Sequence, residues 1–228
     1  MKKIALCLLL IPLLAASSAA FSVTVNVKPA FGIRIPVYSD MEKAAHIAWV
    51  SQTDDTRVIG IDKHLGFYRI RTARGVEGYI ESFAIDPVNE REIYKKVVLA
   101  LYEDRKGHIS SIDRTRKGSP LRIIDAYLSW DQGNIPRLII EYHNVGEKEI
   151  SEFAIMIYCY DGEGRAVRKE GGDNIMHGGS RGLGLTPDGI GKSSWSLKDY
   201  PSTRGYLLKI YEVKFVDGTA WPEAAEQR

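Results

Sequence analysis

A glycine-rich stretch, Gly171–Gly191, is the first place where residue types could do chemistry. Its end, Gly191-Lys192-Ser193, matches the last three residues of a phosphate-binding loop, in which backbone N–H groups and a lysine hold phosphates. That loop needs a further glycine five residues earlier, where this chain has Thr186. The following residues, Ser193–Leu197, alternate as in a strand, whereas a phosphate loop leads into a helix. The sequence therefore predicts a long hairpin or sheet-edge loop here, and no nucleotide cofactor.

Cys159 is the second candidate, as a thiol nucleophile with His143 or His177 as its base. Its neighbours Tyr158 and Tyr160 place it in a predicted strand, where a cysteine commonly packs as a small hydrophobic residue. The sequence therefore favours a structural role for this thiol.

Metal ligands are the third possibility. The short acidic segment Asp161-Gly162-Glu163-Gly164 has too few carboxylates nearby for a cation site, and its composition is typical of a turn. No two histidines stand at metal-ligand spacing. We therefore expect no metal, no cofactor and no catalytic residue, and we interpret the chain as a non-enzyme. The histidines are His46, His64, His108, His143 and His177.

The N-terminus has the composition of a secretory signal peptide. Two lysines precede the apolar run Ile4–Leu14, which has about half of the ~20 residues that a membrane span needs. Ser18 and Ala20 fit a signal peptidase, which would make Phe21 the first mature residue. An uncleaved anchor or a buried N-terminal helix is the alternative. We expect an extracytoplasmic protein, periplasmic or secreted, without a membrane span after cleavage.

Removal of residues 1–20 changes the charge and the cysteine count. The whole chain has 31 Lys and Arg against 29 Asp and Glu, and two of the lysines lie in the signal segment. The remainder is balanced, so no basic excess is left to attract nucleic acid or an anionic membrane. Of Cys7 and Cys159, only Cys159 remains, which excludes an internal disulfide.

Short alternating strands are predicted in residues 21–86. The clearest pair is Phe67–Thr72 and Val76–Glu81, joined at Ala73-Arg74-Gly75, which is the pattern of a β-hairpin. So many short strands in about 60 residues predict a small barrel. The other predicted strands are Ser22–Val27, Arg34–Tyr38, His46–Ser51 and Arg57–Ile61.

Residues 87–119 are predicted to form a helical connector and a basic linker. Asn89 and Glu92 have the spacing of a capping box, and apolar residues recur at helical spacing over Glu90–Asp104. The polar stretch that follows is interpreted as a solvated linker, although it could contact anionic wall polymer or lipid headgroups. Its basic residues are Arg105, Lys106, Arg114, Arg116 and Lys117.

Longer strands are predicted in residues 120–222, before a tail at 223–228. Apolar residues on both faces of Phe153–Asp161 indicate a central strand. The pattern favours an immunoglobulin-like β-sandwich, and therefore a mainly β fold for the whole chain. The predicted strands are Leu121–Trp130, Ile135–Asn144, Ile150–Tyr160, Gly191–Leu197 and Tyr206–Val216.

Two resemblances follow from these segments. Residues 22–86 resemble a bacterial SH3-like domain, through Phe67-Tyr68-Arg69-Ile70, Gly75, Gly78-Tyr79-Ile80 and Ser82-Phe83-Ala84-Ile85. That resemblance implies a small barrel that binds peptide or cell-wall material, as an accessory to other domains. Residues 121–221 are similar to a recurring exported bacterial domain of uncharacterised function, which implies fold and location only.

Four aromatic residues in the SH3-like region are the candidate ligand-binding residues: Tyr38, Trp49, Tyr68 and Tyr79. On an SH3-like fold, aromatic side chains line grooves that hold extended peptides. Trp49 and Phe67 are also the leading core candidates. Tyr68 and Tyr79 are placed opposite the hairpin isoleucines, and are therefore the better candidates for a groove.

The sequence therefore predicts a non-catalytic exported binding or accessory protein of the bacterial cell envelope, whose partner is a cell-wall peptide or an envelope protein. A structural subunit of an exported assembly is the alternative, with the sheet edges making protein contacts. A hydrolase with an unrecognised site, centred on Cys159 or the glycine-rich stretch, is the third hypothesis.

Overall fold

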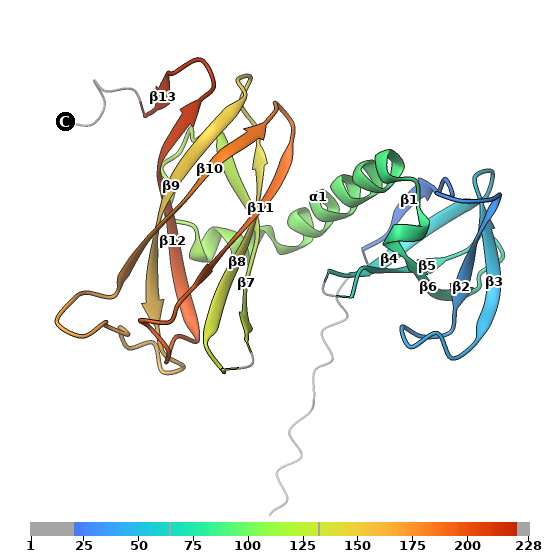
Figure 1. The fold of residues 1–228 in the computed structure, drawn as a ribbon, viewed down its shortest axis with the longest axis horizontal. Helices are drawn as coiled ribbons and strands as arrows, with labels where there is room; N and C mark the ends of the chain where they lie inside the picture. The colour runs from blue at the N-terminus through green and yellow to red at the C-terminus, as the bar shows by residue number, and fades with distance from the viewer. Residues whose placement is uncertain (1–20, 64, 132, 223–228) are drawn as a thin grey trace, which may run out of the picture. The chain divides into compact units, whose positions relative to one another are not determined.

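A computed structural model describes residues 21–63, 65–131 and 133–222 of the chain. The predicted signal peptide at 1–20 and the tail at 223–228 lie outside these described residues. The fold is mainly β (Figure 1): 49% of the described residues lie in strands and 14% in helix. The chain divides into two compact units, the first ending at Asp86 and the second beginning at Pro87. No helix among the described residues is both long and apolar enough to cross a membrane.

The first unit is a six-stranded antiparallel sheet with the order β1-β4-β5-β6-β2-β3. Valine and isoleucine alternate with polar residues along these strands, so one side of each strand enters the core of the unit. A 3₁₀ turn, η1 (Ser82–Ala84), follows the last strand. The strands are β1 (Val23–Asn26), β2 (Arg34–Tyr38), β3 (His46–Ser51), β4 (Asp55–Asp62), β5 (Phe67–Arg71) and β6 (Glu77–Glu81).

The predicted hairpin is the pair β5 and β6. Phe67 lies opposite Glu81 and Arg71 opposite Glu77, so the two strands pair over their full length. Thr72 closes the connection, because its backbone N–H donates to the Val76 carbonyl at 2.9 Å. Gly75 has φ of 81°, the left-handed conformation that favours glycine in such a turn.

The single helix of the described residues, α1 (Pro87–Ile112), corrects the sequence prediction at both ends. It begins at Pro87, a residue suited to a first helical position, so Asn89 lies inside the helix and is not its cap. It continues beyond Asp104, and the first part of the predicted basic linker is therefore helical. Ile109 explains the extension, because it is 3% exposed in the core of the second unit.

The segment after α1 is also attached to the second unit. Asp113 forms a parallel bridge with Leu208, and the Arg114 backbone N–H donates to the Leu208 carbonyl at 2.6 Å. The Ile210 backbone N–H donates to the Thr115 hydroxyl at 3.0 Å. Helix and linker, predicted as a separate connector, therefore belong to the second unit.

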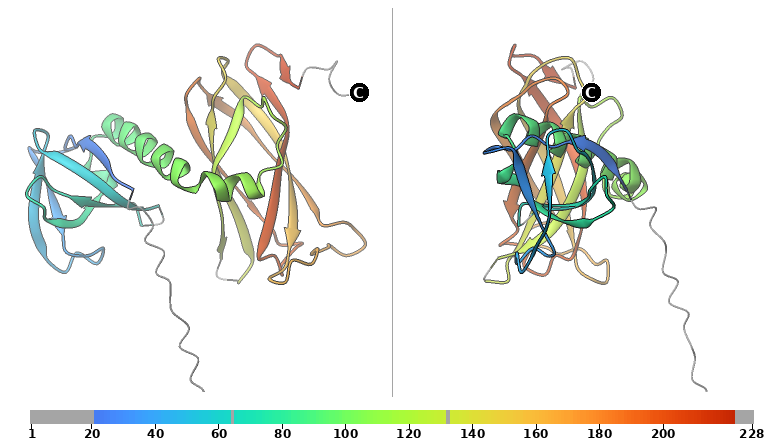
Figure 2. Two further views of the ribbon diagram at one scale, coloured as in Figure 1. Left: turned by 180° about the vertical axis from the view of Figure 1, so that it is seen from behind. Right: turned by 90° about the vertical axis from the view of Figure 1, so that its right-hand side faces the viewer.

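The second unit is a sandwich of two antiparallel sheets, and α1 packs against β7 of one sheet and reaches β12 of the other (Figure 2). Tyr142 of one sheet meets Phe153 of the other with ring centroids 4.9 Å apart, which places the core between the sheets. The three-stranded sheet has the order β11-β8-β7, from β7 (Leu121–Trp130), β8 (Pro136–Asn144) and β11 (Ile190–Ser196). The four-stranded sheet has the order β10-β9-β12-β13, from β9 (Ile150–Tyr160), β10 (Ile175–Leu185), β12 (Gly205–Phe215) and β13 (Ala220–Trp221).

The glycine-rich stretch contains a strand that the sequence prediction missed. β10 pairs with β9 over Ile175–Arg181, and glycines at four of its positions remove the apolar alternation by which a strand is recognised. The central position predicted for β9 is confirmed, because it lies between β10 and β12. The predicted turn after it is also confirmed: Asp161 Oδ1 accepts the backbone N–H groups of Glu163 and Arg165, each at 2.9 Å.

Candidate functional site

Strand pairing in the first unit brings three of the four predicted aromatic residues to one side of the sheet. Residues directly opposite in an antiparallel pair point to the same side. Tyr38 lies opposite Tyr79 on β6, and two residues earlier on β2, Pro36 lies opposite Trp49. The alternate residue Val37 is fully buried. Tyr38, Trp49 and Tyr79 therefore share the solvent side of β3, β2 and β6, which we call the aromatic face.

Exposure within the aromatic face is highest at its edge. Trp49 is 51% exposed on the edge strand β3, although the sequence placed it among the leading core residues. A register shift in the β2–β3 pairing places His46 beside Trp49, with ring centroids 4.4 Å apart and the ring planes tilted by 57°. Trp49 therefore presents a large apolar surface to solvent.

A lysine extends the aromatic face toward η1. The Lys43 ammonium group lies 5.9 Å from the ring centroids of both Tyr38 and Phe83, within the range of cation–π attraction. Glu81 fixes this lysine through an ion pair of 2.5 Å. The hydrogen bond to Glu81 is also the main reason that the pKa of Lys43 is raised, so its positive charge persists. Phe83 is 70% exposed, and sequence analysis did not select it as a ligand-binding residue.

Tyr68 does not belong to this face, which corrects its prediction as a groove residue. It is 1% exposed and lies opposite the buried Ile80. The error is one of strand periodicity: Tyr68 and Ile70 are two residues apart on β5 and therefore point to the same side. Phe67, predicted as a core residue, is confirmed as one at 7% exposed.

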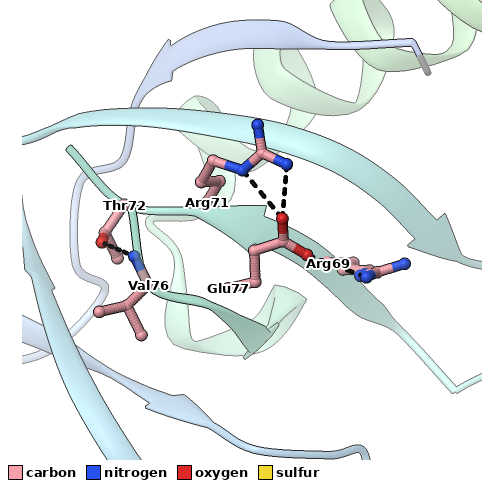
Figure 3. Close-up of polar contacts among 5 residues, drawn as sticks. All are labelled: Arg69, Arg71, Thr72, Val76 and Glu77. Atoms are coloured by element: carbon pink, nitrogen blue, oxygen red, sulfur yellow. Dashed lines mark hydrogen bonds and ion pairs between the residues drawn. The ribbon is translucent and has the colours of Figure 1, made fainter. Parts of the chain in front are cut away.

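The outer side of β5 and β6 also carries a charged cluster of Arg69, Arg71 and Glu77 (Figure 3). Glu77 accepts hydrogen bonds from Arg69 Nη2 at 2.9 Å and from Arg71 Nε at 2.9 Å. The bond from Arg71 is the main reason that the pKa of Glu77 is lowered. Arg69 lies directly opposite Tyr79 in the pairing, so a pair of arginines borders the aromatic face.

In the second unit, Cys159 has the environment of a core residue. It is fully buried between the sheets, and burial raises the pKa of its thiol. Its two proposed partners point elsewhere. His177 lies opposite Met156 on the outer side of the four-stranded sheet, while His143 Nε2 lies 2.8 Å from Asp188 Oδ1 outside the other sheet. The described geometry therefore does not assemble the Cys–His pair.

The partial phosphate-loop motif lies in a strand, as predicted. Gly191, Lys192 and Ser193 are part of β11, paired with Tyr142, Glu141 and Ile140 of β8. Gly191 serves packing here, since a Cβ at this position would collide with the buried Tyr142 ring. Within the described ranges, no group of three or more His, Cys, Asp or Glu could hold a metal ion.

Sequence analysis missed a buried polar cluster beneath α1. Asp125 of β7 and Glu141 of β8 lie opposite each other on the outer side of the three-stranded sheet, where both are buried, and we call these two residues the buried polar row. Lys192 of β11 lies opposite Glu141 at the exposed end of the same row. Glu141 is fully buried and accepts a hydrogen bond from the Tyr94 hydroxyl of α1 at 2.7 Å. Arg105, also on α1, lies 3.6 Å from Asp125. The cluster thus attaches the helix to the sheet.

Stability of the second unit should fall as pH rises above about 10, because burial raises the pKa values of Tyr94, Tyr142 and Tyr206 from their ordinary 10.0. In the unfolded chain these tyrosines lose their protons first, so the folded state binds more protons in this window. Each contributes a loss of about 1.4 kcal/mol per pH unit while it stays protonated in the fold. Urea unfolding between pH 8 and 11 measures the slope, and Tyr206→Phe should make it shallower. A flat profile above pH 10 would contradict this account.

Comparison of the chain with known protein families, with curated proteins and with solved structures found no match. The candidate sites therefore rest on their geometry and chemistry.

Proposed function

We propose that this chain is a non-catalytic exported binding protein of the bacterial cell envelope, and that its aromatic face binds an extended peptide of the cell wall or of an envelope protein. The observation that carries the proposal is the convergence of Tyr38, Trp49 and Tyr79 on one solvent-facing side, with Trp49 half exposed. Large rigid aromatic side chains that remain exposed together are typical of binding surfaces.

The surroundings of the aromatic face suit a peptide. Lys43 at one border and Arg69 and Arg71 at the other supply charged donors for carbonyl or carboxylate oxygens, while the rings supply apolar contact. The edge of β3 offers backbone groups to an added strand. The SH3-like resemblance of residues 22–86 and the signal-peptide composition of residues 1–20 support the same function and location.

The test is retention of the purified exported protein on isolated cell walls, together with cross-linking of its partners in the envelope. Mass spectrometry of the purified protein should show Phe21 as its first residue. Trp49→Ala should weaken retention at least about tenfold, as expected for a central aromatic contact of a binding surface. Trp130→Ala is the matched control, because Trp130 is 45% exposed but lies in the second unit. Absent retention with no cross-linked partner, or equal loss in both variants, would refute the proposal.

A further inference from the structure

The outer side of the four-stranded sheet carries a second feature that could bind a ligand. Alternate residues of its central strand β9 point away from the sandwich core and are only half buried, and no helix of the second unit packs on them. The strand pairing arranges these outward residues in rows across β10, β9 and β12. Such rows are about 6.7 Å apart along the strands, since every second residue faces the same side.

One row has only small residues on two of its three strands. Gly179 on β10 and Ala154 on β9 lie opposite each other, and Glu212 on β12 completes the row. A Cβ added to Gly179 would lie 3.0 Å from the Phe153 carbonyl oxygen, so a larger residue there would cover the backbone of β9. The result is a hollow of about 420 Å³ over the backbone of the two strands, which we call the sheet hollow. Its volume is within the range of small-ligand sites.

The row on one side of the sheet hollow is charged. Arg181, Glu152 and Lys214 lie opposite one another on β10, β9 and β12. Glu152 lies 2.5 Å from the Lys214 ammonium group and 3.3 Å from Arg181 Nε. Its hydrogen bond with Lys214 is the main reason that the pKa of Glu152 is lowered. Together with Glu212, this wall offers two cations and two carboxylates to a ligand.

The other side of the sheet hollow is aromatic. A register shift on β12 between Ile210 and Glu212 inserts Tyr211, which lines the hollow. The Tyr211 ring meets His177 of β10 edge to face, with centroids 6.2 Å apart. The hollow therefore has a charged wall, an aromatic wall and a floor formed by Gly179 and Ala154.

We propose that the sheet hollow is a binding site for a neutral saccharide. A sugar ring has an apolar C–H face that packs on an aromatic ring, and hydroxyl groups that both donate and accept hydrogen bonds. Alternating carboxylates and cations satisfy such hydroxyls without a net charge on the ligand. A phosphate would meet the carboxylates of Glu152 and Glu212, and a purely apolar ligand would remove water from four charged groups without replacing its hydrogen bonds.

The site is independent of the aromatic face, so the two proposals can fail separately. The probe is the β-1,4-linked hexamer of N-acetylglucosamine, titrated into the full chain and followed by NMR and calorimetry, with maltohexaose and cellohexaose in parallel. We expect at least one of these to bind with a dissociation constant of about 1 mM or tighter. Trp49→Ala should bind the same sugar unchanged.

Two variants locate the binding on the sheet. Tyr211→Ala removes the aromatic wall and Ala154→Leu fills the floor, and each should weaken binding at least about tenfold. Tyr158→Ala is the matched control, because Tyr158 faces the same side of β9 two rows away from Ala154 and should leave binding unchanged. Circular dichroism checks that each variant folds. If Ala154→Leu does not fold, the test rests on Tyr211→Ala. Binding of none of the three sugars, equal binding by Tyr211→Ala, or displacement of the sugar by short peptides would overturn the proposal.

Discussion

Replacing Tyr68 by alanine should lower the free energy of unfolding of the first unit by about 3–5 kcal/mol, the usual cost of truncating a large buried aromatic side chain. Tyr68 is 1% exposed and is among the largest fully buried side chains of the described residues. It lies opposite Ile80 on one neighbouring strand and Ile61 on the other, so the truncation leaves a cavity between β4, β5 and β6.

The matched control is Tyr79→Ala on the adjacent strand. Tyr79 points to the solvent side and is only partly buried, so its truncation should cost about 1 kcal/mol or less. Hydrogen exchange of the β4–β6 amides in the full chain measures both variants and separates the first unit from the second. Equal protection in the two variants would mean that Tyr68 is not a core residue.

The strands of this protein were largely predictable, because alternation of apolar and polar residues carries the information locally. β7 and β9 begin and end at the predicted residues. In the first unit, the predicted ends of each strand differ from the observed ends by about two residues or fewer. β10 could not be predicted in this way, because its four glycines have no side chains and so interrupt the alternation of apolar and polar residues. The end of α1 was missed for another reason. Gly107, Ser110 and Ser111 weaken the local helix propensity, and Ile109 is held in a core formed by strands distant in sequence.

The candidate site was predictable in part. Tyr38, Trp49 and Tyr79 were selected by residue type and by the SH3-like pattern, and strand pairing brings them to one side. Trp49 was also taken as a core residue because an apolar residue in a strand is usually buried, whereas β3 is an edge strand. Phe83, outside any strand, had no periodic signal. The sheet hollow depends on which small residues lie opposite each other on different strands, which is a property of register.

The buried polar row was not predicted from the sequence, although the sequence of β8 contains one indication of it. Glu141 is the only acidic residue in the apolar strand β8, and in an isolated sheet it would face solvent. It is nevertheless fully buried, and the hydroxyl of Tyr94 on α1 donates a hydrogen bond to it. Asp125 lies directly opposite it, an arrangement that is unfavourable for like charges unless cations lie nearby. Lys192, 3.9 Å from Glu141, and Arg105, 3.6 Å from Asp125, supply those cations.

A double-mutant cycle on Tyr94 and Glu141 should therefore show strong coupling between helix and sheet. Tyr94→Phe removes a hydrogen-bond donor from a fully buried carboxylate, and Glu141→Leu leaves the Tyr94 hydroxyl without its acceptor. Each single change should destabilise the second unit by about 1–3 kcal/mol, the cost of a buried polar group that loses its partner. The double variant removes both members, so its cost should be smaller than the sum of the two singles by at least about 0.5 kcal/mol.

Urea unfolding near pH 7 provides the four free energies of this cycle, and Glu103→Gln is the control on the same helix. Glu103 is exposed and pairs with Lys106 at 3.4 Å, so its replacement should change stability by no more than about 0.5 kcal/mol. Additive effects of Tyr94→Phe and Glu141→Leu would show that the hydrogen bond does not hold α1 on the sheet. Coupling would show that a specific polar contact fixes the helix to the three-stranded sheet. Tyr94→Phe keeps the aromatic ring and removes only the hydroxyl group, so a loss of apolar packing would not explain the coupling.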